Sequence, residues 1–404
     1  MYLHPILAEM RHNKVGAILI SVQMAITLGI LSNALFIIQQ RIILIARPSG
    51  VDESNVFAVG NQWVGQPNDT PALVKTDLAE LRALTGVVSA YVTNSYPLAN
   101  SGWTWGISLR PDQQNATAPT AVYFADEHTL KTLALKLIAG RNFAADEIVD
   151  RGMNDMPRAS GIIITRALAE KLFPGGNSLG QSVFLQPGLG STRIIGIVDK
   201  LQVPWVIAGI TFNDNSTLAP FRFTAAESYY LVRAQAGQVT AVMAAVQKRL
   251  FDINRARIID QVQTLAEARA EAYRDDRALA VMLAVVSLVL LAVTAFGIVG
   301  LTSYWVTLRR RQIGIRRALG ATRLAIVRYF QTENLLIASA GGVVGIAVAI
   351  ALNLWMVSRF EMARLNYTYT IAGAVIVIAL GQLAALWPAL RAGAIPPAIA
   401  ARTV

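Results

Sequence analysis

The sequence predicts an integral membrane protein with four transmembrane α-helices and a large mixed α/β domain between the first and the second helix. Three observations support this fold class. Of 404 residues, 54% are hydrophobic and only 15% are charged, which is too apolar for a soluble protein of this length. Four long segments carry no charged residue. A single polar region, residues 39–277, separates the first of these segments from the second.

Each of the four uncharged segments is long enough to cross a membrane. A hydrocarbon core of about 30 Å needs roughly 20 residues of helix. The first segment is followed by Gln39, Gln40 and Arg41 rather than a small-residue cleavage site, so an uncleaved anchor is preferred to a signal peptide. The predicted spans are residues 17–38, 278–306, 334–357 and 371–390.

Positive charge is concentrated beside the spans. Residues 39–277 hold 23 Lys and Arg against 22 Asp and Glu, so the net charge of +11 arises elsewhere. The loop at 307–333 carries seven arginines against one acid. Because short Lys- and Arg-rich loops stay in the cytoplasm, this loop and both termini are predicted to be cytoplasmic. The basic residues before the first span and after the fourth are Arg11, Lys14, Arg391 and Arg402.

The polar region is predicted to be an extracytoplasmic mixed α/β domain of two lobes. Short apolar runs alternate with single amphipathic helices, which is typical of βαβ layers. Its balanced charge, with no basic patch interleaved with aromatic residues, argues against nucleic-acid binding. Strands are expected at 161–165, 182–185, 193–198 and 228–233, helices at 166–173 and 238–251, and a turn-rich loop at 174–180.

Residues 264–277 favour helix strongly and contain neither Gly nor Pro before the second span. We expect a stiff stalk that joins the outer domain to the membrane, with a charged linker as the alternative. The expected stalk residues are Leu265, Ala268, Ala272 and Arg277.

No catalytic, cofactor or metal site is predicted. There is no cysteine, which excludes disulfides and thiolate chemistry. Residues 175–182 approach a phosphate-binding loop, but Gln181 stands where its lysine is required. The three histidines are dispersed, and His128 beside Asp126 and Glu127 is only a weak metal candidate.

The predicted spans contain no Asp, Glu, Lys, Arg or His, which disfavours a proton- or ion-coupled carrier. Their polar side chains are expected to form hydrogen bonds between helices. These residues are Gln23, Asn33, Asn353 and Gln382.

The third span contains Gly341, Gly342 and Gly345, a small-residue pattern. Close helix packing is the expected role, and a contact between protomers is the alternative.

Two motifs carry a resemblance to a known family. The segment RRRQIGIRRALGATRLAIV at 309–327 resembles the cytoplasmic loop of MacB/FtsX-type ABC transporter permeases, with Gln312 in place of the usual acid. The segment WPALRAGAIPPAIAAR at 387–402 is similar to that family's C-terminal ending. The loop positions that match are Gly314, Ile315, Arg316, Arg317, Ala318, Leu319, Gly320 and Ala321, and the C-terminal ones are Pro388, Arg391, Ile395, Pro397 and Arg402.

The polar region agrees with this resemblance. The segments AGRNF at 139–143, KLFPGGNSLGQ at 171–181 and RIIGIVDKL at 193–201 look like elements of a MacB-type periplasmic core, in the same order.

The resemblance implies a permease subunit of the bacterial inner membrane, not an enzyme. ATP and Mg would bind a separate nucleotide-binding ATPase subunit, and a second permease chain, identical or paralogous, would complete the complex in the bilayer. A periplasmic adaptor and an outer-membrane channel are further implied partners. The implied divisions are a cytoplasmic segment and first span at 1–38, the periplasmic core at 39–263, stalk and second span at 264–306, a coupling loop at 307–333, two spans at 334–390 and a tail at 391–404.

The coupling loop suits a docking role. A short basic helix bounded by Gly314 and Gly320 would present Ile315, Ala318 and Leu319 to the ATPase. The arginines, among them Arg309, would lie at the rim of this contact. A purely topogenic arginine cluster is the alternative.

Motion transmitted to the outer domain is the expected mode of action, with export as its result. Three alternatives stay open: a lipoprotein-releasing permease, a regulator of a cell-wall hydrolase, and a membrane-tethered sensor or enzyme.

Overall fold

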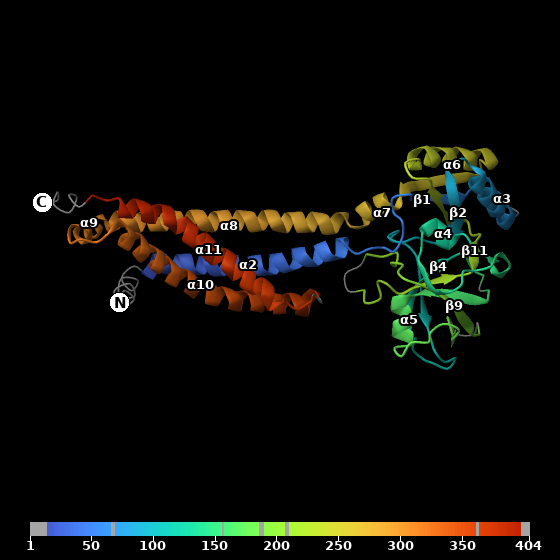
Figure 1. Cartoon of the computed structure of the whole chain (residues 1–404), viewed down its shortest axis with the longest axis horizontal. Helices are drawn as coiled ribbons and strands as arrows, with labels where there is room; N and C mark the ends of the chain where they lie inside the picture. Colours follow the sequence, from blue (N-terminus) through green and yellow to red (C-terminus); the bar gives the residue numbers. More distant parts are fainter. Residues whose placement is uncertain are drawn as a thin grey trace. The chain divides into compact units, whose positions relative to one another are not determined.

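The structure, a computed structural model, divides into two compact units (Figure 1). Arg47–Arg274 forms the outer domain, and the preceding and following segments form the membrane unit. Arg11, Pro397 and Arg402, named above from the sequence, lie outside the described residues, as do the two histidines other than His128, His4 and His12. The structure describes residues 14–65, 69–155, 157–185, 190–206, 210–360 and 363–396.

Four described helices are long and apolar enough to cross a membrane, which confirms the four predicted spans. Each contains one predicted uncharged segment and extends beyond it at both ends, because the flanking polar residues also favour helix. The helices are α2 (Lys14–Ile45), α8 (Arg274–Leu308), α10 (Arg323–Phe360) and α11 (Tyr367–Gly393).

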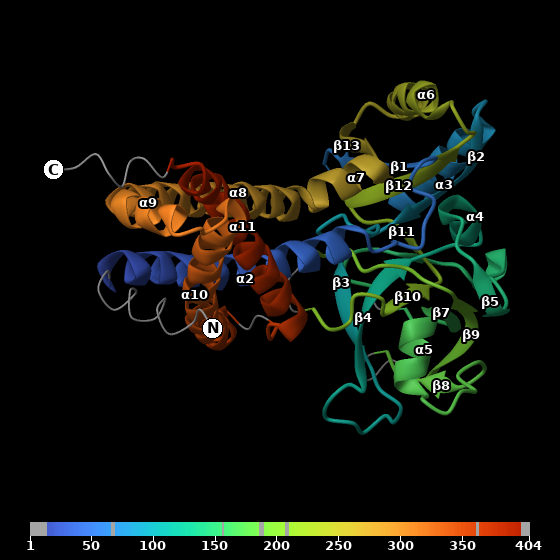
Figure 2. The same ribbon diagram turned by 60° about the vertical axis from the view of Figure 1, so that its left-hand side comes forward.

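Helix α2 packs against the other three spans of the membrane unit (Figure 2). Its buried side chains Ile20, Met24 and Leu28 meet Ile298 of α8 and Ile337 of α10 in one apolar cluster. At the end of α2 that leads to the outer domain, a guanidinium nitrogen of Arg41 lies 2.7 Å from a carboxylate oxygen of Asp276 on α8.

Polar side chains join the spans, as the sequence predicts for Gln23 and Asn33. Gln23 donates to the Val293 carbonyl oxygen on α8 at 3.1 Å, and Asn33 donates to the Ala349 carbonyl oxygen on α10 at 3.0 Å. Gln331 of α10 donates to the backbone carbonyl of Gln382 on α11. Asn353 differs, because its side chain accepts from the backbone of Leu365 in the short connection after α10.

The glycines of α10 are not equivalent. A Cβ atom at Gly341 would lie 2.7 Å from the Ser21 carbonyl oxygen of α2, and one at Gly345 would lie 2.9 Å from Leu28 Cβ. Both glycines therefore allow close approach of α2 and α10. Gly342 faces elsewhere, since no described atom would lie within 4 Å of its Cβ.

Lobe 1 of the outer domain is an antiparallel sheet of order β13-β1-β12-β2 with two helices on one face. Strand side chains alternate: Phe57, Val59 and Tyr230 face these helices, while Val56 and Leu231 face the other way. The elements are β1 (Val56–Trp63), α3 (Thr70–Ala83), β2 (Val87–Thr93), β12 (Glu227–Ala234), α6 (Val239–Ile253) and β13 (Arg257–Thr264).

Lobe 2 is inserted between β2 and β12. Its mixed sheet has the order β3-β4-β10-β7-β9-β5, with β8 paired to β9. Strands β7 and β9 are parallel and joined through α5, which confirms the predicted βαβ unit (Figure 2). Its principal elements are β3 (Trp103–Ile107), β4 (Ala118–Phe124), α4 (Thr129–Leu133), β5 (Leu137–Gly140), β7 (Gly161–Thr165), α5 (Arg166–Leu172), β8 (Ser182–Val183), β9 (Thr192–Val198) and β10 (Ser216–Ala219), with a small separate sheet of β6 (Val149–Arg151) and β11 (Phe221–Phe223).

The two sheets bury an apolar seam between them. Lobe 1 contributes Val56 and Leu231, and lobe 2 contributes Tyr123, Ile163 and Leu218, all of which are buried. Because apolar side chains of both sheets are removed from water at this seam, their burial stabilises the contact between the lobes.

Lobe 1 also contains a fully buried ion pair. Two guanidinium nitrogens of Arg257, on the edge strand β13, donate to the two carboxylate oxygens of Asp77 on α3, each at 2.9 Å. Tyr230 donates to the same carboxylate at 2.6 Å, and the Arg257 guanidinium lies over the Trp63 ring. This pair ties the edge strand to α3.

The expected stalk helix is interrupted. It begins at the capping box of Thr264 and Glu267, forms α7 (Leu265–Ala272), and breaks at Tyr273 before α8 begins at Arg274. The prediction of one continuous helix is therefore wrong. Tyr273 is fully buried in the outer domain, a tertiary environment that helix propensity does not report.

A polar contact crosses between the lobes near α4. Arg82 of α3 donates to the Asp126 carboxylate at 2.9 Å and to the Ala90 carbonyl oxygen. Burial raises the pKa of Asp126 to about 6, and Glu127 adds to this, although Arg82 opposes it. Burial likewise lowers the pKa of His128. Among the described residues no group of His, Asp and Glu could hold a metal ion.

We predict that Gly345→Ala lowers the thermal unfolding temperature of the detergent-solubilised chain, because the new Cβ overlaps Leu28 and overpacking costs about 1 to 3 kcal/mol. Gly342→Ala is the matched control, since helix propensity alone favours Ala by about 1 kcal/mol. Equal effects of the two substitutions would contradict the α2–α10 contact.

We also predict a pH-dependent effect of Asp126. Its pKa of about 6 in the folded state lies above the unfolded value, so its stabilising contribution is present at low pH and is lost as pH rises through 6. Calorimetric unfolding should show wild type losing about 1 kcal/mol relative to Asp126→Asn between pH 5 and pH 7. A constant difference between the two proteins over this interval would show that burial does not perturb the carboxyl.

Candidate partner-docking site

The predicted coupling loop folds into a short helix between the second and third spans. Helix α9 (Arg310–Ala318) follows α8 with only Arg309 between them. It ends in a Schellman motif, in which the Gly320 amide donates to the Arg317 carbonyl oxygen and the Ala321 amide donates to the Arg316 carbonyl oxygen. Gly320 has φ +94°, a conformation that glycine adopts without strain.

The inner face of α9 is fastened by apolar contacts. Ile313 is buried against Phe330 of α10 and against Ala392 and Ile395 at the C-terminal end of the chain. The two motifs that carry the family resemblance therefore meet in one cluster, although 59 residues separate them in sequence. Sequence reasoning did not select Ile313, because its packing partners Phe330 and Ile395 come from distant segments.

A buried ion pair fixes the corner where α8 meets α9. A guanidinium nitrogen of Arg309 lies 2.9 Å from a carboxylate oxygen of Glu333 on α10, and their side chains are only 7% and 3% exposed. The same nitrogen donates to both carboxylate oxygens. The sequence-based placement of Arg309 at the rim of a docking surface is therefore wrong. Arg309 is buried because it pairs with Glu333, which lies beyond α9 in the sequence.

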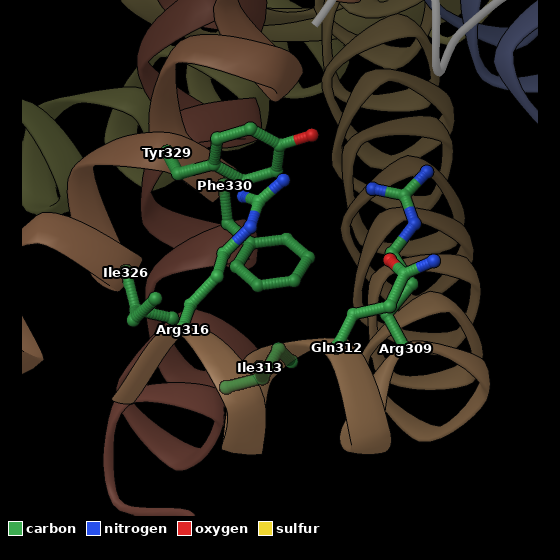
Figure 3. Close-up of a pocket in the computed structure, with 7 residues that line it drawn as sticks. All are labelled: Arg309, Gln312, Ile313, Arg316, Ile326, Tyr329 and Phe330. Carbon is green, nitrogen blue, oxygen red and sulfur yellow. The ribbon is translucent and has the colours of Figure 1, made fainter. Parts of the chain in front are cut away.

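A small open depression lies between α9 and α10 (Figure 3). Arg316 extends over the Tyr329 ring, with its guanidinium carbon 4.9 Å from the ring centre. Gln312 lines the same depression, at the position where the family motif has an acid. The remaining lining residues are Arg309, Ile313, Ile326 and Phe330.

The outer face of α9 is apolar at its centre and uncovered in the described chain. Ile315 is 44% exposed and Leu319, at its C-terminal end, is 83% exposed. Ala318 is also exposed, and the three side chains share one face because they lie three and four residues apart. Exposed Arg310 and Arg311 lie in the first turn of the same helix. This arrangement can bind an apolar pocket with an acidic border.

Gly314 does not bound the helix as the sequence suggested. It is buried within α9, on the inner face beside Ile313, and only Gly320 marks an end. Arg317 is partly buried and Ala321 follows the terminal turn.

The other residues singled out from the sequence lie apart from α9. Leu265 and Ala268 are buried on α7 in the outer domain, and Ala272 ends that helix. Arg277 is exposed on α8 in the membrane unit. The stalk set is thus divided between two units of the structure.

Comparisons with known families bear on both units. Residues 15–249 match the model of the MacB-like periplasmic core domain, and residues 284–397 match that of the FtsX-like permease C-terminal domain. Together with the four apolar helices, these matches define a multi-pass ABC transporter permease with an extracytoplasmic domain. The first match alone covers more than half of the sequence, and the chain belongs to the MacB/FtsX-type permease family.

Two relatives have similar sequences at low identity. The macrolide export ATP-binding/permease protein MacB of Chromobacterium violaceum is 23% identical over 307 residues, which cover 70% of this chain and 43% of the relative. The uncharacterized ABC transporter permease YvrN of Bacillus subtilis is 24% identical over 293 residues, covering 70% of this chain and 69% of the relative. The chain thus spans less than half of the MacB protein's length.

Among solved structures, the periplasmic region of MacB from Actinobacillus actinomycetemcomitans superposes with a TM-score of 0.34 and 15% identity. The match covers 54% of this chain and 94% of that structure.

We predict that Arg309→Ala destabilises the membrane unit strongly. It removes the guanidinium from the buried Arg309–Glu333 pair, and breaking a buried ion pair typically costs about 3 to 5 kcal/mol. Unfolding in detergent, followed by circular dichroism, should show a large loss for Arg309→Ala. Exposed Arg310→Ala, one residue away, is the control and should shift unfolding little. Similar shifts for both variants would show that the ion pair contributes no stability.

Proposed function

We propose that this chain is the permease subunit of an ATP-driven complex in which the outer face of α9 docks a separate nucleotide-binding ATPase subunit. The observation that carries the proposal is the pair Ile315 and Leu319, exposed on a helix whose opposite face is fixed by Ile313 and by the buried Arg309–Glu333 pair. A helix packed this tightly can transmit a displacement of its partner to the spans, because close-packed side chains are hardly compressible.

The ATPase is assigned to another subunit on chemical grounds. The sequence has Gln181 where a phosphate-binding loop needs lysine, and it offers no other such loop. One relative is named an ATP-binding/permease protein, and this chain covers 43% of it. ATP and Mg are therefore proposed to bind the partner, and this chain to hydrolyse no ATP itself.

The proposed orientation places α9, both termini and the arginine-rich loop in the cytoplasm of a bacterial cell, with the outer domain in the periplasm. The distribution of basic residues supports this orientation in the inner membrane. A second permease chain, identical or paralogous, is proposed to complete the complex in the bilayer. A periplasmic adaptor and an outer-membrane channel are proposed as further partners.

ATP turnover is proposed to move the outer domain rather than to open a conduit within one chain. The four predicted spans contain no Asp, Glu, Lys, Arg or His, and the side chains of Gln23 and Asn33 bond to neighbouring helices. Export of a substrate from the envelope is the favoured outcome. Lipoprotein release and control of a cell-wall hydrolase use the same transmitted motion.

The docking proposal predicts that Leu319→Asp abolishes copurification of the ATPase subunit. The substitution buries an unpaired carboxylate at the centre of the contact, which costs several kcal/mol. Affinity purification of the tagged chain from its native host, with the ATPase identified by mass spectrometry, measures the loss.

Arg310→Ala is the control, because a rim charge contributes little to affinity. Equal membrane levels and an unchanged protease digestion pattern of the outer domain show that both variants fold. If Leu319→Asp retains the ATPase at wild-type yield, α9 is not the docking surface.

A further inference from the structure

Helix α7 is part of the core of the outer domain rather than a free-standing stalk. Leu265 and Ala268 are buried in the seam between the lobes, in the same apolar cluster as Val56 of lobe 1 and Leu218 of lobe 2. The helix also follows directly from the edge strand β13. A displacement of α7 must therefore disturb the packing of both sheets.

An ion pair fixes α7 to the segment that enters the outer domain. The Arg269 guanidinium donates to both carboxylate oxygens of Glu53, each at 2.6 Å, and the Ser49 hydroxyl donates to the same carboxylate. Such two-pronged contacts hold orientation as well as distance. The guanidinium of Arg269 also lies over the ring of Tyr273.

Tyr273 connects the end of α7 to lobe 2 by two hydrogen bonds in series. Its hydroxyl accepts from the side-chain amide of Gln202 at 2.9 Å. The backbone carbonyl of Gln202 in turn accepts from the Tyr123 hydroxyl of β4 at 2.6 Å. All three residues are buried, so each bond lies in a medium of low polarity where it is strong.

Tyr273 is also the residue at which the helix breaks. Its φ and ψ of −102° and 12° leave the helical range, and α8 begins at the next residue. Helix α8 thus follows the outer domain after a single non-helical residue, whose side chain is buried in that domain.

We propose that Tyr273, held by Gln202, is the positioning residue that delivers movement of α8 to the seam between the two lobes, so that the lobes change their separation when ATP is turned over. This inference rests on the proposed coupling to an ATPase. Arg269 and Glu53 orient α7, and the Gln202–Tyr123 bond carries displacement to the central region of the lobe 2 sheet.

A distance measurement within the outer domain tests the proposal. The chain has no cysteine, so Lys248→Cys on α6 and Glu170→Cys on α5 place one exposed label on each lobe. Pulsed electron resonance on the purified permease–ATPase complex gives the distance between two spin labels. It is recorded without nucleotide and with Mg-ATP and vanadate.

We expect the nucleotide to shift this distance in the labelled parent chain. Tyr273→Phe and Gln202→Met should each reduce the shift in distance at least twofold. The double variant should reduce it no further than the more affected single variant does, because both substitutions remove the same hydrogen bond. Tyr91→Phe is the matched control. Its hydroxyl lies in the same seam but forms no hydrogen bond with any described residue.

Each outcome is decisive. A full shift in Tyr273→Phe, or an equal loss in Tyr91→Phe, overturns the role of Tyr273 while ATP hydrolysis and docking stand. If the parent complex hydrolyses ATP but the distance between the labels does not change, the proposed movement of the lobes is wrong, while the proposed function stands. A chain that binds no ATPase overturns the proposed function and this inference with it. The melting temperature of each variant distinguishes loss of the Tyr273–Gln202 hydrogen bond from misfolding. If Tyr273→Phe does not fold, Gln202→Met still tests the proposal.

Discussion

The cost of a charge in hydrocarbon is the constraint on which the whole architecture depends. It keeps the predicted spans free of Asp, Glu, Lys, Arg and His, so the charged groups of the membrane unit lie beyond the ends of these segments. Two of these ends hold ion pairs, Arg41 with Asp276 toward the outer domain and Arg309 with Glu333 beside α9. In the proposed function, spans of this kind carry displacement rather than ions.

Helix α8 is terminated differently at its two ends. Beside α9 it ends at a buried ion pair and an apolar cluster around Ile313, which leave little freedom. At the other end it starts immediately after Tyr273, where the backbone leaves the helix. The proposed transmission of movement by α8 relies on this difference, because a displacement needs a rigid helix end where it enters and a defined pivot where it leaves.

Sequence patterns predicted the spans, the βαβ unit and the exposed face of α9, because these depend on local periodicity and on short motifs. They failed where partners come from distant segments. The sequence around Arg309 does not indicate that it forms a buried ion pair with Glu333. Helix propensity around Tyr273 likewise does not indicate its hydrogen bond with Gln202. The three glycines of α10 were equivalent in sequence, yet only the packing of α2 shows that Gly342 differs from its neighbours.

The insertion of lobe 2 within lobe 1 dictates an order of assembly. In the lobe 1 sheet, β1 and β2 are not neighbours, since β12 lies between them and pairs with both. Strands β1 and β2 therefore remain unpaired with β12 until residue 234 has been translated. By then all described strands of lobe 2 have been synthesised. The lobe nearer the middle of the chain can fold first, and the sheet that leads into α7 closes last. The sheet that leads through α7 to α8 is therefore completed only after every described strand of lobe 2 has been synthesised.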